Sequence, residues 1–410
     1  MRCANTRVIF AACLSVAGPA CSWLCPPQAA AAPAALPVPV QTERFVLEPG
    51  QEMIGRVQVV RIQPHQVLAD IARLFDVGYD SIKHANPKVN PWLAPVGTRV
   101  IVPTEFILPD APHVGIVVNI AAMRLFYFPP RKPGQPQVVI THPVGIGRLG
   151  HPTPTMVTRV TWHQAHPEWI VPRSILASHA RRGTPLPRVV AAGPDNPLGN
   201  YALHLSYPEI LIHGTDRPAG VGRRVSHGCI HLYPEDIRQL FKMVPNGTPV
   251  RVVNQPYLFA WQNGRLYMQA YGALQDDKRP WKTDSALLAR MLPRRWVSDL
   301  TRSGEKIDWK RVRHLVGDPR VVPLPVSGRG PVHGGMVATL VQNRLPLGSA
   351  WNGQTHLPLT TAQFDKVLTQ IHSTAMPKYP VAADPRRATL TGKASAHRRG
   401  GRRLESHRAL

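Results

Sequence analysis

The residues of this 410-residue chain that are best suited to chemistry are a cysteine and the histidines close to it. Cys229 lies in the run Val225–Leu232, which reads VSHGCIHL, and His213 lies upstream in the run IHGT. A free thiol is mostly protonated at neutral pH, and a neighbouring imidazole can take its proton to create a nucleophile. Glycines let backbone N–H groups approach a developing oxyanion. Cysteine, histidine and glycine together therefore predict acyl transfer through a thioester.

The N-terminus indicates where that chemistry takes place. Arg2 and Arg7 precede a short apolar run, Val8 to Gly18, and alanines follow at positions 29–32. A charged flank, a short apolar stretch and a small-residue exit are the parts of a secretory signal peptide. The run is shorter than the roughly 20 residues that span a bilayer, and a buried N-terminal helix is the alternative interpretation. We therefore predict a signal peptide at residues 1–32 and a soluble, periplasmic protein.

Removal of the signal peptide would leave Cys229 as the single cysteine of the mature chain. The other four cysteines all precede residue 33, at positions 3, 13, 21 and 25. Thiols pair in exported proteins, so a lone thiol is either buried and inert or kept for chemistry. The histidines and glycines beside Cys229 favour chemistry.

The chain before the cysteine motif begins with a linker and a small module. Residues 33–55 are rich in alanine and proline, which is typical of an extended linker. Residues 56–104 have the pattern strand, helix, helix, strand, and the first helix presents an apolar stripe from Val67 to Phe75. This order resembles a LysM module, the small glycan-binding unit of cell-wall proteins, and the resemblance implies that the module binds peptidoglycan. A spacer of the same fold that binds nothing is the alternative.

Residues 112–254 carry the cysteine motif and predict a β-dominated domain. Apolar alternation and turn residues indicate strands near 117–128, 138–144, 201–213 and 248–253. A helix is expected to begin at Pro234, because proline suits a first helical turn and the following Glu235 and Asp236 favour its positive end. Loops rich in proline and glycine are expected to fill residues 147–200.

Several blocks of this domain resemble the catalytic domain of the L,D-transpeptidases of bacterial cell walls. The signature of that family is a histidine, a spacer and then Ser/Thr-His-Gly-Cys, and here twelve residues separate His213 from Ser226. The runs GPDNPLG at 193–199 and LYPEDI at 232–237 match the members that carry an N-terminal LysM module. The resemblance implies a mainly β fold, in which a β-sandwich-like catalytic domain follows a βααβ LysM-like module. It implies no cofactor.

The resemblance also implies a role for each residue of the motif. By position, the nucleophile is Cys229, the general base is His213, the carbonyl that orients this base belongs to Gly214, the oxyanion region is shaped by His227 and Gly228, Ser226 is architectural, and the substrate contacts are His231, Tyr201 and Trp169. Cys229 would attack the carbonyl that joins an L-centre to D-alanine in a tetrapeptide stem, and D-alanine would leave. An amine of a second stem, or of an outer-membrane lipoprotein, would then resolve the thioester.

Two departures from the family pattern bear on substrate binding. Relatives usually carry arginine two residues after the cysteine, where this chain has His231. They often carry glycine after Thr-Pro-x, where this chain has Met156 after Thr153-Pro154-Thr155. Arginine holds a carboxylate at any pH, whereas histidine does so only when it is protonated. We therefore expect use of the acyl donor to fall as the pH rises through the titration of His231.

Three other interpretations fit parts of the sequence. His227, Cys229 and His231 alternate, so on a strand they would point one way and could bind zinc, with His213 as a fourth ligand. A cysteine peptidase that only trims stems would share the thioester. A non-catalytic protein could instead anchor itself to the wall through the LysM-like module and a basic tail.

The last predictions concern the net charge of the chain and residues 255–410. The chain has 49 Lys and Arg against 24 Asp and Glu, and its net charge of +25 suits an anionic envelope surface. Nucleic acid is not expected as a partner, because the sequence has no zinc-finger spacing, Walker loop or aromatic-interleaved basic motif. Residues 255–300 predict a small appendage, residues 301–385 give no clear pattern, and residues 386–410 predict a disordered basic tail.

Overall fold

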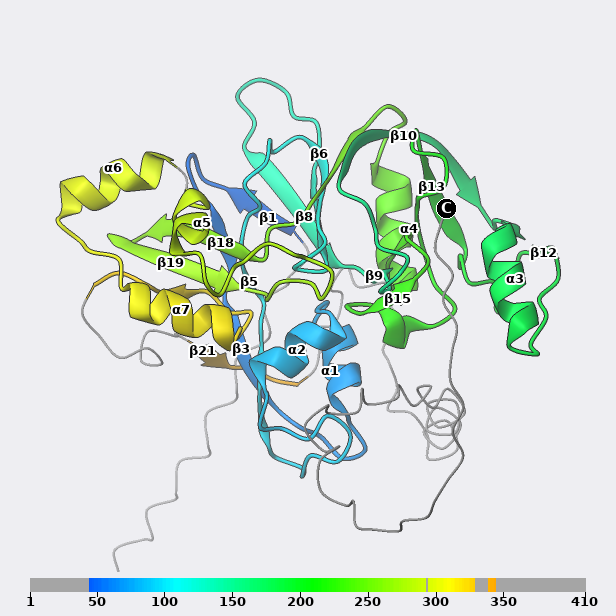
Figure 1. Ribbon diagram of the computed structural model, residues 1–410, viewed down its shortest axis with the longest axis horizontal. Helices are drawn as coiled ribbons and strands as arrows, with labels where there is room; N and C mark the ends of the chain where they lie inside the picture. The colour runs from blue at the N-terminus through cyan, green and yellow to red at the C-terminus, as the bar shows by residue number, and fades with distance from the viewer. Residues whose placement is uncertain (1–43, 293, 329–337, 344–410) are drawn as a thin grey trace, which may run out of the picture.

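The structure, a computed structural model, describes residues 44–292, 294–328 and 338–343 (Figure 1). The predicted signal peptide and the predicted basic tail lie outside these residues. Within the described ranges, no helix has the length and apolar character that crossing a bilayer requires. The described chain is mainly β, as the sequence predicts.

The elements follow one another along the chain with these bounds. The strands are β1 (Arg44–Leu47), β2 (Met53–Gly55), β3 (Val57–Arg61), β4 (Arg99–Val102), β5 (Glu105–Ile107), β6 (Gly115–Asn119), β7 (Arg124–Phe128), β8 (Gln137–Pro143), β9 (Ile146–Gly147), β10 (Met156–Ala165), β11 (Trp169–Ile170), β12 (Val189–Val190), β13 (Tyr201–Leu205), β14 (Leu211–His213), β15 (Arg224–Ser226), β16 (Ile230–His231), β17 (Pro249–Val253), β18 (Tyr257–Gln262), β19 (Arg265–Ala270), β20 (Leu324–Pro325) and β21 (Ala338–Leu340). The helices are α1 (Leu68–Leu74), α2 (Tyr79–Ala85), α3 (Arg173–Arg181), α4 (Pro234–Met243), α5 (Ser285–Arg290), α6 (Arg294–Ser303) and α7 (Trp309–Gly317), with a 3₁₀ turn, η1 (Pro218–Gly220).

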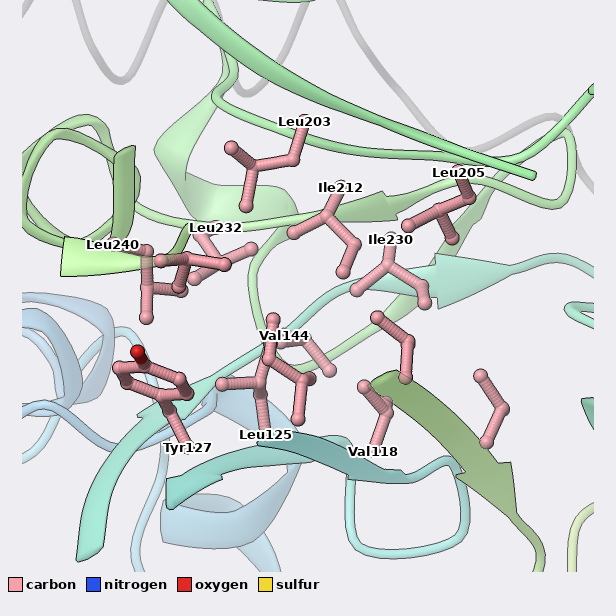
Figure 2. Packing of buried hydrophobic residues seen from close by; sticks show 14 of the residues in the cluster. Val118, Leu125, Tyr127, Val144, Leu203, Leu205, Ile212, Ile230, Leu232 and Leu240 are labelled. Atoms are coloured by element: carbon pink, nitrogen blue, oxygen red, sulfur yellow. The ribbon is translucent and has the colours of Figure 1, made fainter. Parts of the chain in front are cut away.

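A nine-stranded sheet forms the domain that carries the cysteine, in the order β1-β8-β7-β6-β17-β10-β13-β14-β16. Neighbouring strands are antiparallel except for two parallel pairs, β17 with β6 and β14 with β16. β10 joins the two halves, because its first part pairs with β17 and its second part with β13. Figure 2 shows Val118 and Leu125 of one half facing Leu203 and Ile212 of the other across an apolar core. This is the sandwich-like arrangement that the sequence predicts.

β10 and α3 correct the prediction that loops fill residues 147–200. β10 has ten residues and is rich in β-branched side chains, such as Val157, Thr158 and Val160, which favour strands. α3 follows Pro172, its N-cap residue, and buries Ile175. The prediction gave the flanking prolines and glycines more weight than this local pattern.

The predicted linker at residues 33–55 is wrong in its C-terminal part. β1 pairs with β8 at the edge of the large sheet, and β2 pairs with β5. Leu47 and Ile54 are buried with Phe106 and Val117 in a second apolar core. Val117 alternates with the residues of the first core along β6, so this second core covers the opposite face of the sheet.

β3, α1, α2 and β4 form the small module, in the predicted order strand, helix, helix, strand. β3 and β4 are antiparallel, and the helices pack on them through Ile71 and Ile82. β21 adds an unexpected third strand, parallel to β3, and Val341 joins the same core. The module therefore includes residues 338–341, which lie far from β3 in the sequence.

The C-terminal unit is larger than the predicted appendage at 255–300. β18, β19 and β20 form a sheet, and α5, α6 and α7 pack around a core that includes Trp281, Trp296, Leu315 and Val326. The predicted boundary at residue 300 falls inside α6. Because α7 and β20 contribute to the same core, the unit continues to about residue 326.

The small module docks on the loop that precedes the cysteine motif. Gly78, at the start of α2, lies against Gly222, and a Cβ on Gly78 would come within 2.7 Å of the Gly222 Cα. The Tyr79 N–H donates to the carbonyl of Val221 at 3.2 Å. Only glycine at both positions allows this close approach of the two backbones. The module therefore supports the segment between the upstream histidine and the cysteine.

Candidate active site

The cysteine motif and the upstream histidine meet on two parallel strands. The register of β14 and β16 pairs Ile212 with Ile230 and His213 with His231. Side chains alternate across a strand, so the two isoleucines share one face and the two histidines share the other. Both isoleucines are fully buried in the core of Figure 2. Cys229 immediately precedes β16, and its Sγ contacts Leu211, which lies two residues before His213 on β14.

The thiol of Cys229 is half-buried and contacts backbone groups. The Leu211 N–H donates to Sγ at 3.4 Å, and the thiol donates to the Glu209 carbonyl at 3.6 Å. Burial raises the pKa of the Cys229 thiol, and the hydrogen bond from Leu211 opposes that rise. The sulfur therefore holds its proton at neutral pH until a base removes it.

His213 has the protonation state of such a base. Its Nδ1 lies 2.6 Å from the Gly214 carbonyl oxygen, and Nδ1 must carry the proton because a carbonyl only accepts. Burial, followed by the nearby His231, lowers the pKa of His213 to about 3. The ring is therefore neutral at physiological pH, and its Nε2 has a free lone pair. The Gly214 carbonyl lies where an orienting group is expected.

A loop whose structural role the sequence did not reveal holds His213 from another side. The backbone of Leu198 forms a hydrogen bond with the ring. Asn196 is fully buried and fixes this loop, because its Nδ2 lies 2.8, 3.2 and 3.0 Å from three backbone carbonyls. Its Oδ1 accepts the Leu198 N–H at 2.9 Å. Both residues lie in the run 193–199, whose only recognised feature in the sequence was its match to relatives.

Three side-chain contacts hold the peptide groups on both sides of Cys229. Ser226 Oγ donates to the Cys229 carbonyl at 2.6 Å and accepts the Gly228 N–H at 3.2 Å. Thr153, which was not predicted as a site residue, donates to the Gly228 carbonyl at 2.8 Å. Gly228 has a φ of +113°, which a residue with a side chain rarely adopts. The peptide is trans, so the Cys229 N–H points away from the Gly228 carbonyl and is a candidate oxyanion donor.

His227 contacts an arginine from a distant part of the sequence. Its Nε2 lies 2.7 Å from Arg148 Nη2, and the guanidinium must be the donor. Burial, and then the charge of Arg148, lowers the pKa of His227 to about 4. His227 is therefore neutral at physiological pH, and its role in shaping the oxyanion region stays a prediction.

His231 does not have the charge that its predicted role requires. The ring is buried beside Gly145 and forms a hydrogen bond with the backbone of Gly220. Burial lowers the pKa of His231 to about 4, and the hydrogen bond opposes the fall. A neutral ring cannot attract a carboxylate by charge at physiological pH. Burial therefore argues against a charged contact between His231 and a carboxylate at neutral pH, and its role in substrate binding stays a prediction.

The other two predicted substrate contacts lie apart from the thiol. The register of β13 and β14 pairs Ala202 with His213, so Tyr201 lies on the opposite face. Its partly buried ring packs 4.7 Å from that of Phe241 and against the apolar core, and its contact with substrate stays a prediction. Trp169 is half-buried in β11 and remains a predicted contact.

The four residues of the zinc alternative do not gather into a metal site. Among the described residues, the single group of three or more potential ligands with donor atoms within 4.8 Å is Asp76, His142 and Asp236. Arg124 lies against this group, with Nη2 3.8 Å from Asp76 Oδ2. Arg124 and His142 both contact the carboxylates of this group, so we assign the cluster to ion pairing rather than to a metal.

The chain is similar to several known proteins. The family described as YkuD, L,D-transpeptidase catalytic domain, matches residues 113–252. The protein named Probable L,D-transpeptidase YcfS, from Escherichia coli K12, is 39% identical over 254 residues, which cover 60% of this chain and 78% of that protein. Probable L,D-transpeptidase ErfK/SrfK, from Salmonella typhimurium LT2, is 33% identical over 286 residues, which cover 69% and 90% of the two chains. The crystal structure of L,D-transpeptidase 3 from Mycobacterium tuberculosis is 20% identical with a TM-score of 0.25, and covers 40% of this chain and 71% of that one.

Proposed function

Because the chain belongs to the L,D-transpeptidase family, we propose that it transfers peptidoglycan stems through a thioester, with Cys229 as the nucleophile and His213 as the general base. The observation that supports the proposal is the pairing of β14 with β16, which brings the cysteine motif beside the strand that carries His213, with the Leu211 N–H donating to Cys229 Sγ at 3.4 Å. The acyl donor is a tetrapeptide stem of the cell wall. The acceptor is an amine of a second stem or of an outer-membrane lipoprotein.

In the first half-reaction, Nε2 of His213 takes the proton of the Cys229 thiol as the sulfur attacks the carbonyl before D-alanine. The Cys229 N–H stabilises the oxyanion of the tetrahedral intermediate. The intermediate collapses when the C–N bond breaks, and the imidazolium gives its proton to the departing amine of D-alanine. The products are the thioester and free D-alanine.

In the second half-reaction, the acceptor amine attacks the thioester carbonyl and His213 takes the proton that the amine loses. The C–S bond breaks, and the proton returns from His213 to the sulfur. A new amide joins the two chains, and the resting state of two neutral groups is restored.

The resting charges support this order of events. The raised pKa of Cys229 and the lowered pKa of His213 both disfavour a stored thiolate–imidazolium pair. The proton therefore moves during the attack, as in general-base catalysis. A thiol that is protonated at rest also resists oxidation, which suits the periplasmic location that we propose from the N-terminal sequence.

Mass spectrometry of the intact protein and of its products tests the proposal. Full-length mature protein is incubated with a defined tetrapeptide muropeptide and an amine acceptor. We expect one acyl adduct, release of D-alanine and a cross-linked product, and Cys229→Ala should give none of them. An adduct that persists in Cys229→Ala would contradict the proposal.

The same experiment separates the alternatives. Release of D-alanine followed by a free tripeptide, with no cross-linked product at any acceptor concentration, would indicate a peptidase. No turnover, together with sedimentation with insoluble peptidoglycan, would indicate an anchoring protein. Stoichiometric zinc in the purified protein would support the metal site instead.

The small module is proposed to hold the enzyme on glycan strands. Its order of elements and the close contact of Gly78 with Gly222 support a unit that binds the wall and stays fixed to the catalytic domain. This proposal concerns location on the wall and not the chemistry, so soluble stems should not need it.

A further inference from the structure

Basic residues from two separate segments act on His227. Arg148 follows β9, His151 lies three residues later, and His179 and Arg182 lie at the C-terminal end of α3. The His151 ring centroid is 4.7 Å from that of His227, and Arg148 bonds its Nε2. The positive charges of these four residues all act to lower the pKa of His227. His227 itself lies two positions before the thiol.

Arg148 has a charge that no carboxylate balances. Its guanidinium donates to His227, which is neutral, and its Nε is buried without a hydrogen-bond partner. In the part of the chain that the structure describes, it forms no ion pair. A guanidinium presents several N–H donors in a fixed plane that matches a carboxylate. An anion beside the guanidinium of Arg148 would therefore balance its charge.

The neighbouring strand provides an internal comparison. Arg224 of β15 also bonds the β9 backbone, through the Gly147 carbonyl at 3.1 Å. Its guanidinium is paired with Asp276 in a two-point contact of 2.9 and 2.6 Å. The two arginines thus lie beside the same strand, but one has a protein partner and the other does not. Arg148 is also tied to the cysteine motif, because its backbone N–H donates to the Ser226 carbonyl at 2.9 Å.

We propose that Arg148, together with His151 beside His227, forms a carboxylate-binding site for the acyl-donor stem. The proposal rests on the transpeptidase function, since it names the part of the donor that this site recognises. The stem offers the terminal carboxylate of its D-alanine and carboxylates along its side chains. Both have the same chemistry, and the experiment below distinguishes them.

Binding to an inactive protein tests the site without turnover. Isothermal titration calorimetry measures the Kd of a soluble tetrapeptide stem for full-length mature Cys229→Ala, for the same protein with Arg148→Gln or Arg148→Lys added, and for a control with Arg99→Gln added. Arg99 is an exposed residue of β4 in the small module. Three ligands are compared: the free-acid stem, the stem amidated at its D-alanine carboxyl, and the stem amidated at its side-chain carboxyls.

We expect Arg148→Gln to weaken binding of the free-acid stem by about 10- to 100-fold, the usual effect of a hydrogen-bonded charged group, and Arg99→Gln to leave it within twofold. One of the amidated stems should bind the Arg148-containing protein as weakly as the free acid binds Arg148→Gln, and this identifies the carboxylate. Arg148→Lys should recover part of the loss, because it keeps the charge without the planar fork.

Equal Kd values for all three stems on the Arg148-containing protein would overturn the inference, and this comparison needs no variant of Arg148 to fold. A Kd for Arg148→Gln equal to that of Arg99→Gln would overturn it as well. Failure of the proposed function looks different, because the wild-type protein would then transfer no acyl group while Arg148 still discriminated between free and amidated stems.

Discussion

His213 in the candidate active site and His142 at the module interface are both buried, at 6% and 0% exposure, but their surroundings shift their pKa values in opposite directions. Burial, followed by His231, lowers the pKa of His213 to about 3, and no carboxylate acts on it among the described residues. Burial would lower the pKa of His142 too, but the charges of Asp236 and Asp76 raise it to about 10. Desolvation keeps a histidine neutral at physiological pH, whereas nearby carboxylates keep it protonated.

The partners of His142 explain why its pKa differs from that of His213. His142 Nδ1 lies 3.3 Å from Asp76 Oδ2, which belongs to the small module, and 3.4 Å from Asp236 Oδ1 at the start of α4. Arg124 adds a second cation beside Asp76, while burial and the charge of Asp76 raise the pKa of Asp236. This cluster joins the module to the catalytic domain through charge. At His213, a fixed charge would remove the lone pair that the reaction uses.

Loss of the base should have the largest effect. His213→Ala should lower the rate of Cys229 acylation by a tetrapeptide about 10²–10⁴-fold, because a positioned general base contributes that much. The thermal midpoint should change little, since the ring supplies one hydrogen bond to a local carbonyl. Stopped-flow or quenched mass spectrometry measures the acylation rate. A decrease of less than tenfold would mean that another group takes the thiol proton.

Loss of one carboxylate from the His142 cluster should destabilise the fold and leave the chemistry intact. Asp76→Asn removes one partner from a buried ionic group, which costs about 3–5 kcal/mol in the free energy of unfolding. Urea denaturation measures the loss, and Asp110→Asn, at an exposed loop position, is the matched control. The acylation rate of the folded fraction should stay within about threefold of wild type. Unchanged stability in Asp76→Asn would show that the cluster does not hold the module.

The pH dependence of stability should separate the two histidines by sign. The pKa of His142 is raised to about 10, so its stabilisation is complete below about 6.5, the value in the unfolded chain, and is lost as the pH rises from there through 10. The pKa of His213 is lowered to about 3, so its effect appears as stability lost while the pH falls from about 6.5 towards 3. Each slope can reach about 1.4 kcal/mol per pH unit.

Denaturation curves at a series of pH values check these slopes. His142→Gln should remove the alkaline slope and His213→Gln should remove the acid one. If His142→Gln lost its acid slope instead, the assignment of charges at the interface would be reversed.

The sequence predicted the residues that lie close together along the chain, and it missed those that the fold brings in. His213 and Cys229 lie in local motifs with recognisable spacing, and the helix from Pro234 follows from its first turn. Thr153, Asn196 and Arg148 act on the site through tertiary contacts that no local pattern reveals.

Two consequences of folding could not be predicted from the sequence. Glu235 and Asp236 lie in the first turn of α4, as predicted, and they also pair with Arg73 and His142 of other segments. His231 was expected to be charged because the unperturbed pKa of histidine lies near neutrality, and burial removes that charge. Both the pairing and the burial depend on the folded structure.

The smallest expected effect concerns His231, a third buried histidine, which can be compared with His213 and His142. If burial without a carboxylate is enough to keep a histidine neutral, His231 should behave as His213 does and not as His142 does. His231→Gln keeps a hydrogen-bond donor for Gly220, so kcat/KM for a tetrapeptide donor should change by less than about threefold, within the value of one neutral hydrogen bond. The pH profile of the variant should coincide with that of wild type between about pH 5 and 9, because His231 carries no charge to lose above its pKa of about 4. A wild-type decline in donor use near pH 6–7 that disappears in His231→Gln would show that the imidazole is charged and restore its predicted grip on a carboxylate.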